Sequence, residues 1–168
     1  MKDDITLLTF VLEEVWYAVN VHEVQEVVPL PELTPLTDAP PFVSGIFNLR
    51  GRIVTTLDLR QRMGLGRDTW DVKNAVLVIL LEQKLYGLIV DEALSLIKLS
   101  AEDMEPAPDL SSLTGVESQF IFRVGKLEGR LIPILNLNRI FTTIKPQKLS
   151  NWQVKEDQGG QGGGYVNG

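Results

Sequence analysis

Hydrophobic residues occur along this chain in short runs, separated by glycine, proline, asparagine and aspartate. Such runs, rich in valine, isoleucine, leucine and aromatic residues, are typical of β-strands. No stretch keeps a helical period over about four turns, so we expect helices to be short. The predicted strands are Leu7–Leu12, Trp16–Val19, Gln25–Val28, Val43–Leu49, Arg52–Leu57, Val76–Leu81, Tyr86–Val90, Leu94–Leu99, Phe120–Val124 and Leu131–Leu135.

Two short helical segments are predicted between these strands. Asp58 follows a strand and is a favoured N-cap for a helix over Leu59–Met63, which Gly64 would end. The segment Ser100–Asp103 resembles a capping box, in which a serine and an acidic residue three positions later satisfy each other's backbone groups.

The chain also resembles itself. The segment Gly51–Leu59 reads GRIVTTLDL, and Gly129–Leu137 reads GRLIPILNL, at an offset of 78 residues. Where the two segments have Asp58 and Asn136, both residues are favoured N-caps. A second match, at an offset of 69, sets Glu13, Tyr17, Val21 and Glu23 over Glu82, Tyr86, Val90 and Glu92. We therefore predict two similar all-β halves, each of about five strands and one short helix, curled into small barrels.

The composition argues against most kinds of catalytic site. The 168 residues contain no cysteine and one histidine, His22, which we interpret as a structural residue at a strand end. The paired acids Glu13-Glu14 and Asp91-Glu92 are interpreted as solvated turn charges, because adjacent strand residues point to opposite faces. We expect no catalytic site, no metal site and no cofactor. The glycine-rich segment 150–168 is expected to be a disordered tail.

The net charge of -6 is unevenly distributed. Residues 1–47 hold one lysine against eight acidic residues, whereas residues 48–67 hold five arginines against Asp58 alone. The basic segment either pairs internally with the acidic one or forms a docking face for an acidic or mixed-charge partner. The acidic balance argues against nucleic acid. The longest apolar run, Ala75–Leu81, is far too short to cross a membrane, so we expect a soluble, cytoplasmic protein.

One tract identifies a family resemblance. The segment Gly45–Val54, which reads GIFNLRGRIV, and the following Leu57–Arg60, which reads LDLR, resemble the CheW family of coupling proteins in bacterial chemotaxis. Tyr17–Val27 and Val90–Pro108 look like further parts of that family, and the resemblance runs from about Leu7 to Phe141. The polar residues Arg52, Thr55 and Thr56 and the tail depart from the family pattern.

The resemblance implies a single CheW-like domain over residues 1–149, made of two SH3-like five-stranded barrels. Its lobes would span roughly 20–75 and 76–141, with strand exchange possible. It also implies a non-enzymatic adaptor that couples methyl-accepting chemoreceptors to a CheA-type histidine kinase, at membrane-associated receptor arrays and without inserting into the membrane. An adaptor of a related chemosensory pathway, such as pilus-based motility, and, more distantly, a small-barrel nucleic-acid-binding module remain alternatives.

By family position, three sets of residues are candidates for function. Glu26 and Arg50 are expected to face each other, with the burial of this pair left open. The predicted receptor-binding residues, in a groove between the barrels, are Val21, Val24 and Val90. The predicted kinase-binding residues, at the outer end of the first barrel, are Val27, Leu33, Thr34, Phe42 and Val43.

Overall fold

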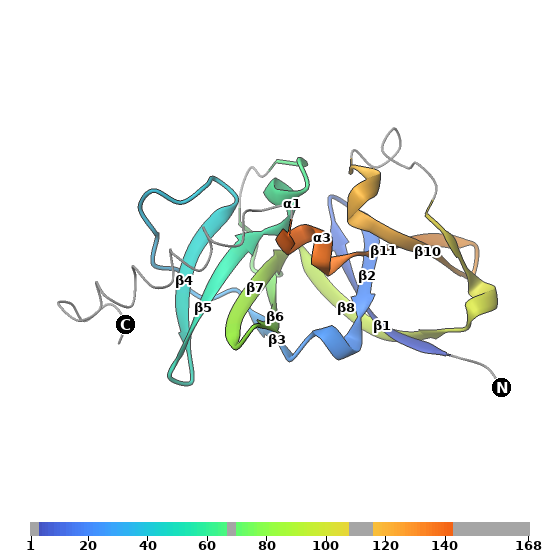
Figure 1. Ribbon diagram of the computed structural model, residues 1–168, viewed down its shortest axis with the longest axis horizontal. Coiled ribbons are helices and arrows are strands. Elements are labelled where there is room, and N and C mark those ends of the chain that lie inside the picture. Colours follow the sequence, from blue (N-terminus) through green and yellow to red (C-terminus); the bar gives the residue numbers. More distant parts are fainter. Residues whose placement is uncertain (1–3, 67–69, 108–115, 143–168) are drawn as a thin grey trace.

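The computed structural model describes residues 4–66, 70–107 and 116–142, so the predicted tail at 150–168 lies outside the described residues. It consists of two β-sheets side by side, with short helices at their junction (Figure 1). The first sheet has the order β8 (Glu92–Leu99), β1 (Ile5–Leu12), β2 (Val15–Asn20), β11 (Arg130–Leu135), β10 (Ile121–Leu127) and β9 (Met104–Pro106). The second has the order β3 (Glu26–Pro29), β6 (Ala75–Leu81), β7 (Lys84–Val90), β5 (Arg52–Asp58) and β4 (Val43–Leu49).

We call these the six-stranded lobe and the five-stranded lobe. The remaining elements are the helices α1 (Leu59–Arg62) and α3 (Leu137–Thr142) and the 3-10 turns η1 (Val21–Glu23), η2 (Ala101–Asp103) and η3 (Ser118–Phe120). All ten predicted strands are present, and the predicted all-β class is confirmed. The additional strand, β9, is three residues long, which is too short to show a hydrophobic period.

The two repeats exchange their first hairpins. The β1–β2 hairpin pairs with β8 and β11 from the second half of the chain, and the β6–β7 hairpin pairs with β3 and β5 from the first half. The five-stranded lobe therefore takes its strands from residues 26–90, and the six-stranded lobe takes its strands from residues 5–20 and 92–135. These ranges differ from the expected 20–75 and 76–141, because a hairpin's hydrophobic pattern does not specify which sheet it joins.

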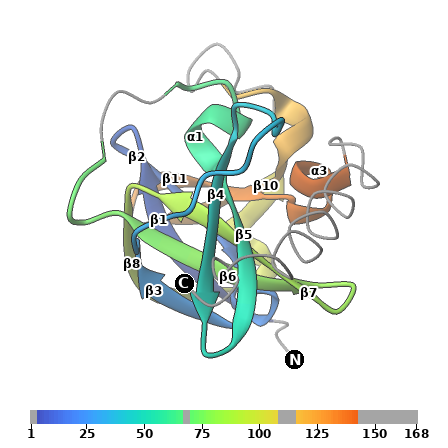
Figure 2. The ribbon, with the colours of Figure 1, turned by 90° about the vertical axis from the view of Figure 1, so that its left-hand side faces the viewer.

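Each sheet curls until its two edges are linked by the chain. After β3, Thr34 forms two backbone hydrogen bonds with Ile46 of β4, at 2.9 and 2.8 Å, which joins the edges of the five-stranded lobe. After β8, the chain passes through η2 into β9, which pairs with β10 at the other edge of the six-stranded lobe. Figure 2 shows the curled five-stranded lobe, with β4 and β5 crossing over β6 and β7. Both lobes thus protect the edges of their sheets.

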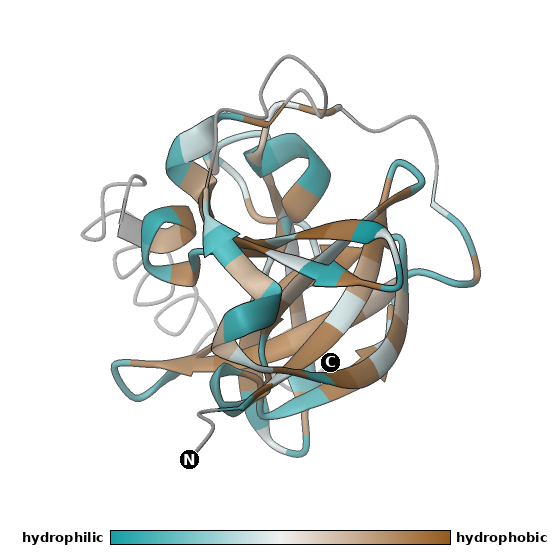
Figure 3. Cartoon of the chain, turned by 90° about the vertical axis from the view of Figure 1, so that its right-hand side faces the viewer, coloured by the Kyte–Doolittle hydropathy of each residue, from teal (hydrophilic) through white to brown (hydrophobic). Residues whose placement is uncertain are grey.

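Three apolar clusters hold the domain together. Each lobe has its own inner cluster, formed around Val76 and Leu85 in the five-stranded lobe and around Leu99 and Ile132 in the six-stranded lobe. A larger central cluster lies between the lobes and contains residues of both sheets, α1 and α3. The hairpin strands are covered on both faces, which explains their continuous apolar runs. In Figure 3, hydrophobic residues follow the strands of the six-stranded lobe and hydrophilic residues gather at its turns.

The internal repeat extends to backbone geometry. Glu13 and Glu14 turn the β1–β2 hairpin at positive φ values of 50° and 68°, and Glu82 and Gln83 turn β6–β7 at 52° and 71°. Asp58 accepts hydrogen bonds from the first turn of α1, and Asn136 accepts one from Arg139 in α3 at 3.3 Å. The two halves therefore share their turns and helix starts as well as their strand order.

The equivalence of the two caps leads to a prediction for Asp58. Its buried carboxylate accepts hydrogen bonds from the N–H groups of Arg60, at 3.1 Å, and Gln61, at 3.5 Å. Asp58→Ala is expected to lower the free energy of unfolding by about 0.5–2 kcal/mol, because α1 loses its cap. Asp58→Asn, which copies Asn136, is expected to retain most of that stability in urea unfolding. Equal losses in both variants would contradict a capping role.

Candidate docking surfaces

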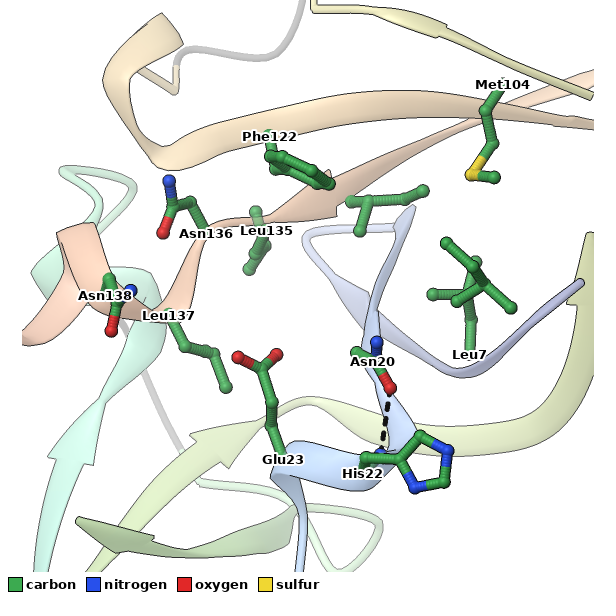
Figure 4. Close-up of a pocket in the computed structure, with 12 residues that line it drawn as sticks. Leu7, Asn20, His22, Glu23, Met104, Phe122, Leu135, Asn136, Leu137 and Asn138 are labelled. Atoms are coloured by element: carbon green, nitrogen blue, oxygen red, sulfur yellow. Dashed lines mark hydrogen bonds between the residues drawn. The ribbon is translucent and has the colours of Figure 1, made fainter. Parts of the chain in front are cut away.

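A groove runs between the lobes on the side of η1, where the chain crosses from β2 to β3. It consists of two hollows of about 320 and 390 Å³ that share His22, Glu23, Leu137 and Asn138. Figure 4 shows the first hollow, with η1 on one side and the start of α3 on another. We call these two hollows together the η1 groove.

The η1 groove is mainly apolar. Met104 and Phe122 line its first hollow, and Leu80 and Phe141 line the second. Phe122 is 56% exposed and Leu80 is 42% exposed, so each hollow presents a large apolar side chain to solvent. Glu23 extends its carboxylate into the space beside Leu137 (Figure 4), and partial burial raises the pKa of this carboxyl group. The groove therefore suits a largely apolar ligand surface.

Of the three residues predicted to bind the receptor, two lie beside this groove. Val21 and Val24 are half-buried at η1, and Val24 packs against the central cluster. Val90 is fully buried within that cluster. It therefore cannot line an open groove, because β7 is covered on both faces. The uninterrupted apolar run that ends at Val90 was the sequence signal for this burial.

The five residues predicted to bind the kinase do not share one packing environment. Val27 is 40% exposed on β3, at the edge of its sheet. Phe42 and Val43 pack against the central cluster, whereas Leu33 packs against the inner cluster of the five-stranded lobe. Thr34 is exposed, and its backbone joins that lobe's edges. Their role in binding stays a prediction.

Leu33 also lines a hollow that sequence reasoning missed. This hollow, of about 590 Å³ at one end of the five-stranded lobe, includes Trp70 and Val72, which are 48% and 98% exposed. The sequence signal for this hollow was that two large apolar residues, Trp70 and Val72, alternate with the charged residues Asp71 and Lys73. Exposed apolar side chains beside a hollow are typical of protein contacts.

The predicted pair of Glu26 and Arg50 does form an ion pair. Its side chains are 32% and 69% exposed, respectively, so the pair is largely solvated rather than buried. An exposed ion pair contributes less than about 1 kcal/mol to folding. The pair is therefore available for contact with a partner.

Like Arg50, Arg60 of the basic segment forms ion pairs with acidic residues of the protein itself. Arg60 binds Asp91 at 3.0 Å and Glu13 at 3.3 Å. The Asp91 side chain is 19% exposed and also accepts a hydrogen bond from the Glu13 N–H at 2.8 Å, so its interpretation as a solvated turn charge was wrong. The error arose because a strand pattern does not show which turns the fold brings together. Glu13 is a turn residue with its side chain 45% exposed, as expected. Arg67 lies outside the described residues.

Arg62 joins the two lobes. Its Nε donates to the Ile140 carbonyl at 3.0 Å, and its guanidinium lies 5.5 Å from the ring of Phe42 and 4.8 Å from the ring of Phe120. Burial lowers the pKa of this arginine. Among the described residues, its buried Nη2 has no hydrogen-bond partner. Sequence reasoning treated Arg62 only as part of a basic segment.

Across residues 4–66, 70–107 and 116–142, no group of three or more possible protein ligands could hold a metal ion. Within the same ranges, none of the helices has the length and hydrophobicity required to span a bilayer.

The curled sheets, the repeated halves and the N-L-R-G tract define a CheW-like domain. A sequence model of the CheW-like domain matches residues 6–145, most of the chain. The chain belongs to the CheW-like domain family of chemotaxis adaptors.

Individual relatives agree with this assignment. The chain is 30% identical to the chemotaxis protein CheW of Treponema pallidum over 149 residues, which covers 86% of each chain. It is also 30% identical to that of Rhizobium meliloti over 135 residues, covering 80% of this chain and 86% of the relative. The crystal structure of the scaffolding protein TtCheW from Thermoanaerobacter tengcongensis superposes with a TM-score of 0.73 at 28% identity, covering 83% of this chain and 88% of the other.

Proposed function

We propose that this protein is a non-enzymatic cytoplasmic adaptor that couples methyl-accepting chemoreceptors to a CheA-type histidine kinase at receptor arrays. The observation that carries the proposal is the family match over residues 6–145. The apolar hollows support it, because an adaptor needs surfaces for two partners at once. The receptor would contact the η1 groove beside Val21 and Val24, and the kinase would contact the five-stranded lobe beside Val27 and Leu33.

Reconstitution tests this proposal directly. A CheA-type kinase, a soluble receptor signalling fragment and this protein are combined, and kinase autophosphorylation is measured with each component omitted in turn. We expect receptor-dependent control of the kinase only when all three are present. Unchanged kinase activity on adding this protein, together with the absence of a ternary complex in size-exclusion chromatography, would refute the proposal.

Arg50 is expected to matter for signalling more than for folding. Arg50→Ala should weaken receptor control of the kinase in the reconstituted complex, while lowering the free energy of unfolding by less than about 1 kcal/mol, since its pair with Glu26 is exposed. Arg52→Ala is a matched control, because Arg52 is also exposed and donates to the Gln83 carbonyl at 3.2 Å. Arg67→Ala is likewise expected to preserve control.

Normal kinase control by a complex containing Arg50→Ala would contradict a signalling role for this pair. The free energy of unfolding, measured in urea, separates a loss of signalling from a loss of fold.

A further inference from the structure

The internal repeat creates two equivalent junctions between the lobes. One lies where the end of β7 meets the β1–β2 turn and α1. The other lies where the end of β2 meets the β6–β7 turn and α3. The offsets of 69 and 78 residues place Asp91 opposite His22 in the comparison, Glu13 opposite Glu82, and Arg60 opposite Asn138. The first and third of these pairs differ in side chain, whereas the glutamate is common to both junctions, so the two junctions can be compared directly.

The first junction is tied together. Arg60 bridges Asp91 and Glu13, with Arg60 and Asp91 only 17% and 19% exposed. The Asp91 N–H also donates to the Val11 carbonyl at 3.0 Å, and β8 begins to pair with β1 immediately, at Glu92 and Val11. Most residues around the remaining hollow, of about 240 Å³, are charged or polar. Side-chain and backbone contacts both hold this junction closed.

Among the residues that the structure describes, the second junction has no counterpart of the Arg60 ion pairs. Asn138 carries no charge, so it cannot form the ion pairs that Arg60 forms. The His22 N–H donates to Asn20 Oδ1 at 3.0 Å, whereas the equivalent Asp91 N–H bonds to the neighbouring hairpin. Pairing of β3 with β6 begins at Glu26 and Val78, with a hydrogen bond from the Gln25 N–H to the Val78 carbonyl at 2.7 Å just before it. Leu80, the equivalent of Val11, lies beyond this pairing and is 42% exposed. This junction is part of the η1 groove.

We propose that Arg60, Asp91 and Glu13 lock one junction, and that His22 and Asn138 at the equivalent positions keep the other open and thereby determine where the receptor docks. The inference rests on the proposed function, in which a helical receptor tip occupies the η1 groove. Glu23 in that groove favours a tip whose apolar stripe is flanked by a basic side chain. The repeat thus offers two sites, and the side chains at two positions, His22 and Asn138, leave one of them usable.

The test transfers the lock to the open junction. His22→Asp with Asn138→Arg places an aspartate and an arginine beside the native Glu82. Because the chain has no cysteine, Leu80→Cys provides a single thiol that reports access to the groove. In the locked variant, we expect this thiol to react with a maleimide at least tenfold more slowly. In the cysteine-free background, we expect at least tenfold weaker binding of a receptor helical-hairpin fragment and kinase binding within twofold of wild type.

A matched variant, His22→Asn with Asn138→Gln, keeps both positions uncharged and is expected to change thiol reactivity and receptor binding by less than twofold. Conversely, Arg60→Gln should increase the reactivity of Val11→Cys, because the closed junction loses its bridge. Circular dichroism confirms that each variant is folded.

Unchanged Leu80→Cys reactivity in the locked variant overturns the inference, as does full receptor binding when the thiol is protected. A wild-type protein that fails to bind the receptor fragment contradicts the proposed function instead. In that case the two thiol reactivities still decide whether the junctions are unequal.

Discussion

Phe10→Ala is expected to lower the free energy of unfolding by about 3–5 kcal/mol and to weaken both lobes together. Phe10 lies on β1, is fully buried in the central cluster and stacks on Tyr17, with ring centroids 6.2 Å apart. That cluster contains strands of both sheets, so the cavity removes contacts from each lobe. Urea unfolding followed by circular dichroism and by tryptophan fluorescence should give coincident transitions at a lower midpoint.

Leu96→Ala is the control for this substitution, because Leu96 is 59% exposed on β8. Its effect should stay within about 0.5 kcal/mol. Two separate unfolding transitions in Phe10→Ala would show that the lobes are independently stable, contrary to the shared cluster.

Gly87→Ala is expected to destabilise the five-stranded lobe by about 1–3 kcal/mol through overpacking. A Cβ at Gly87 would lie 2.5 Å from Cγ1 of Val76 and 3.2 Å from Cγ1 of Val54. Both valines are buried β-branched residues of the inner cluster and cannot move aside easily. The free energy of unfolding in urea measures the loss.

A second substitution tests the cause of that loss. Val76→Ala removes the methyl group that the new Cβ would meet, so adding Gly87→Ala to Val76→Ala should cost much less than adding it to the wild type. Equal costs in the two backgrounds would show that backbone conformation, rather than the contact with Val76, requires this glycine.

The strands could be predicted from the sequence because each is a short apolar run bounded by glycine, proline, asparagine or charged residues. The exchange of hairpins could not. The β1–β2 and β6–β7 hairpins have similar apolar patterns and similar turns, so each would satisfy either sheet. Which sheet each hairpin joins depends on how the chain crosses between the sheets, through η1 after β2 and into β8 after β7.

Only part of the candidate docking surfaces could be predicted from the sequence, because the rest depends on contacts between residues that are far apart in the chain. The facing of Glu26 and Arg50 followed from the family resemblance, whereas their exposure required the structure. Val90 was misplaced in the groove because the sheet that covers its second face is built from distant residues. The bridging role of Arg62 depends on Phe42 and Phe120, which are 20 and 58 residues away in the sequence.

The exchanged hairpins also constrain how the chain can fold as it is synthesised. The β1–β2 hairpin leaves the ribosome first, yet its parallel partner β11 ends at Leu135. The five-stranded lobe has all its strands once Val90 has emerged, about 45 residues earlier. The hairpin itself ends at Asn20, 115 residues before Leu135, so synthesis at about 5–20 residues per second leaves it without β11 for roughly 6–23 s. During that time, β2 presents an open edge on which a chaperone, or another nascent chain, could act.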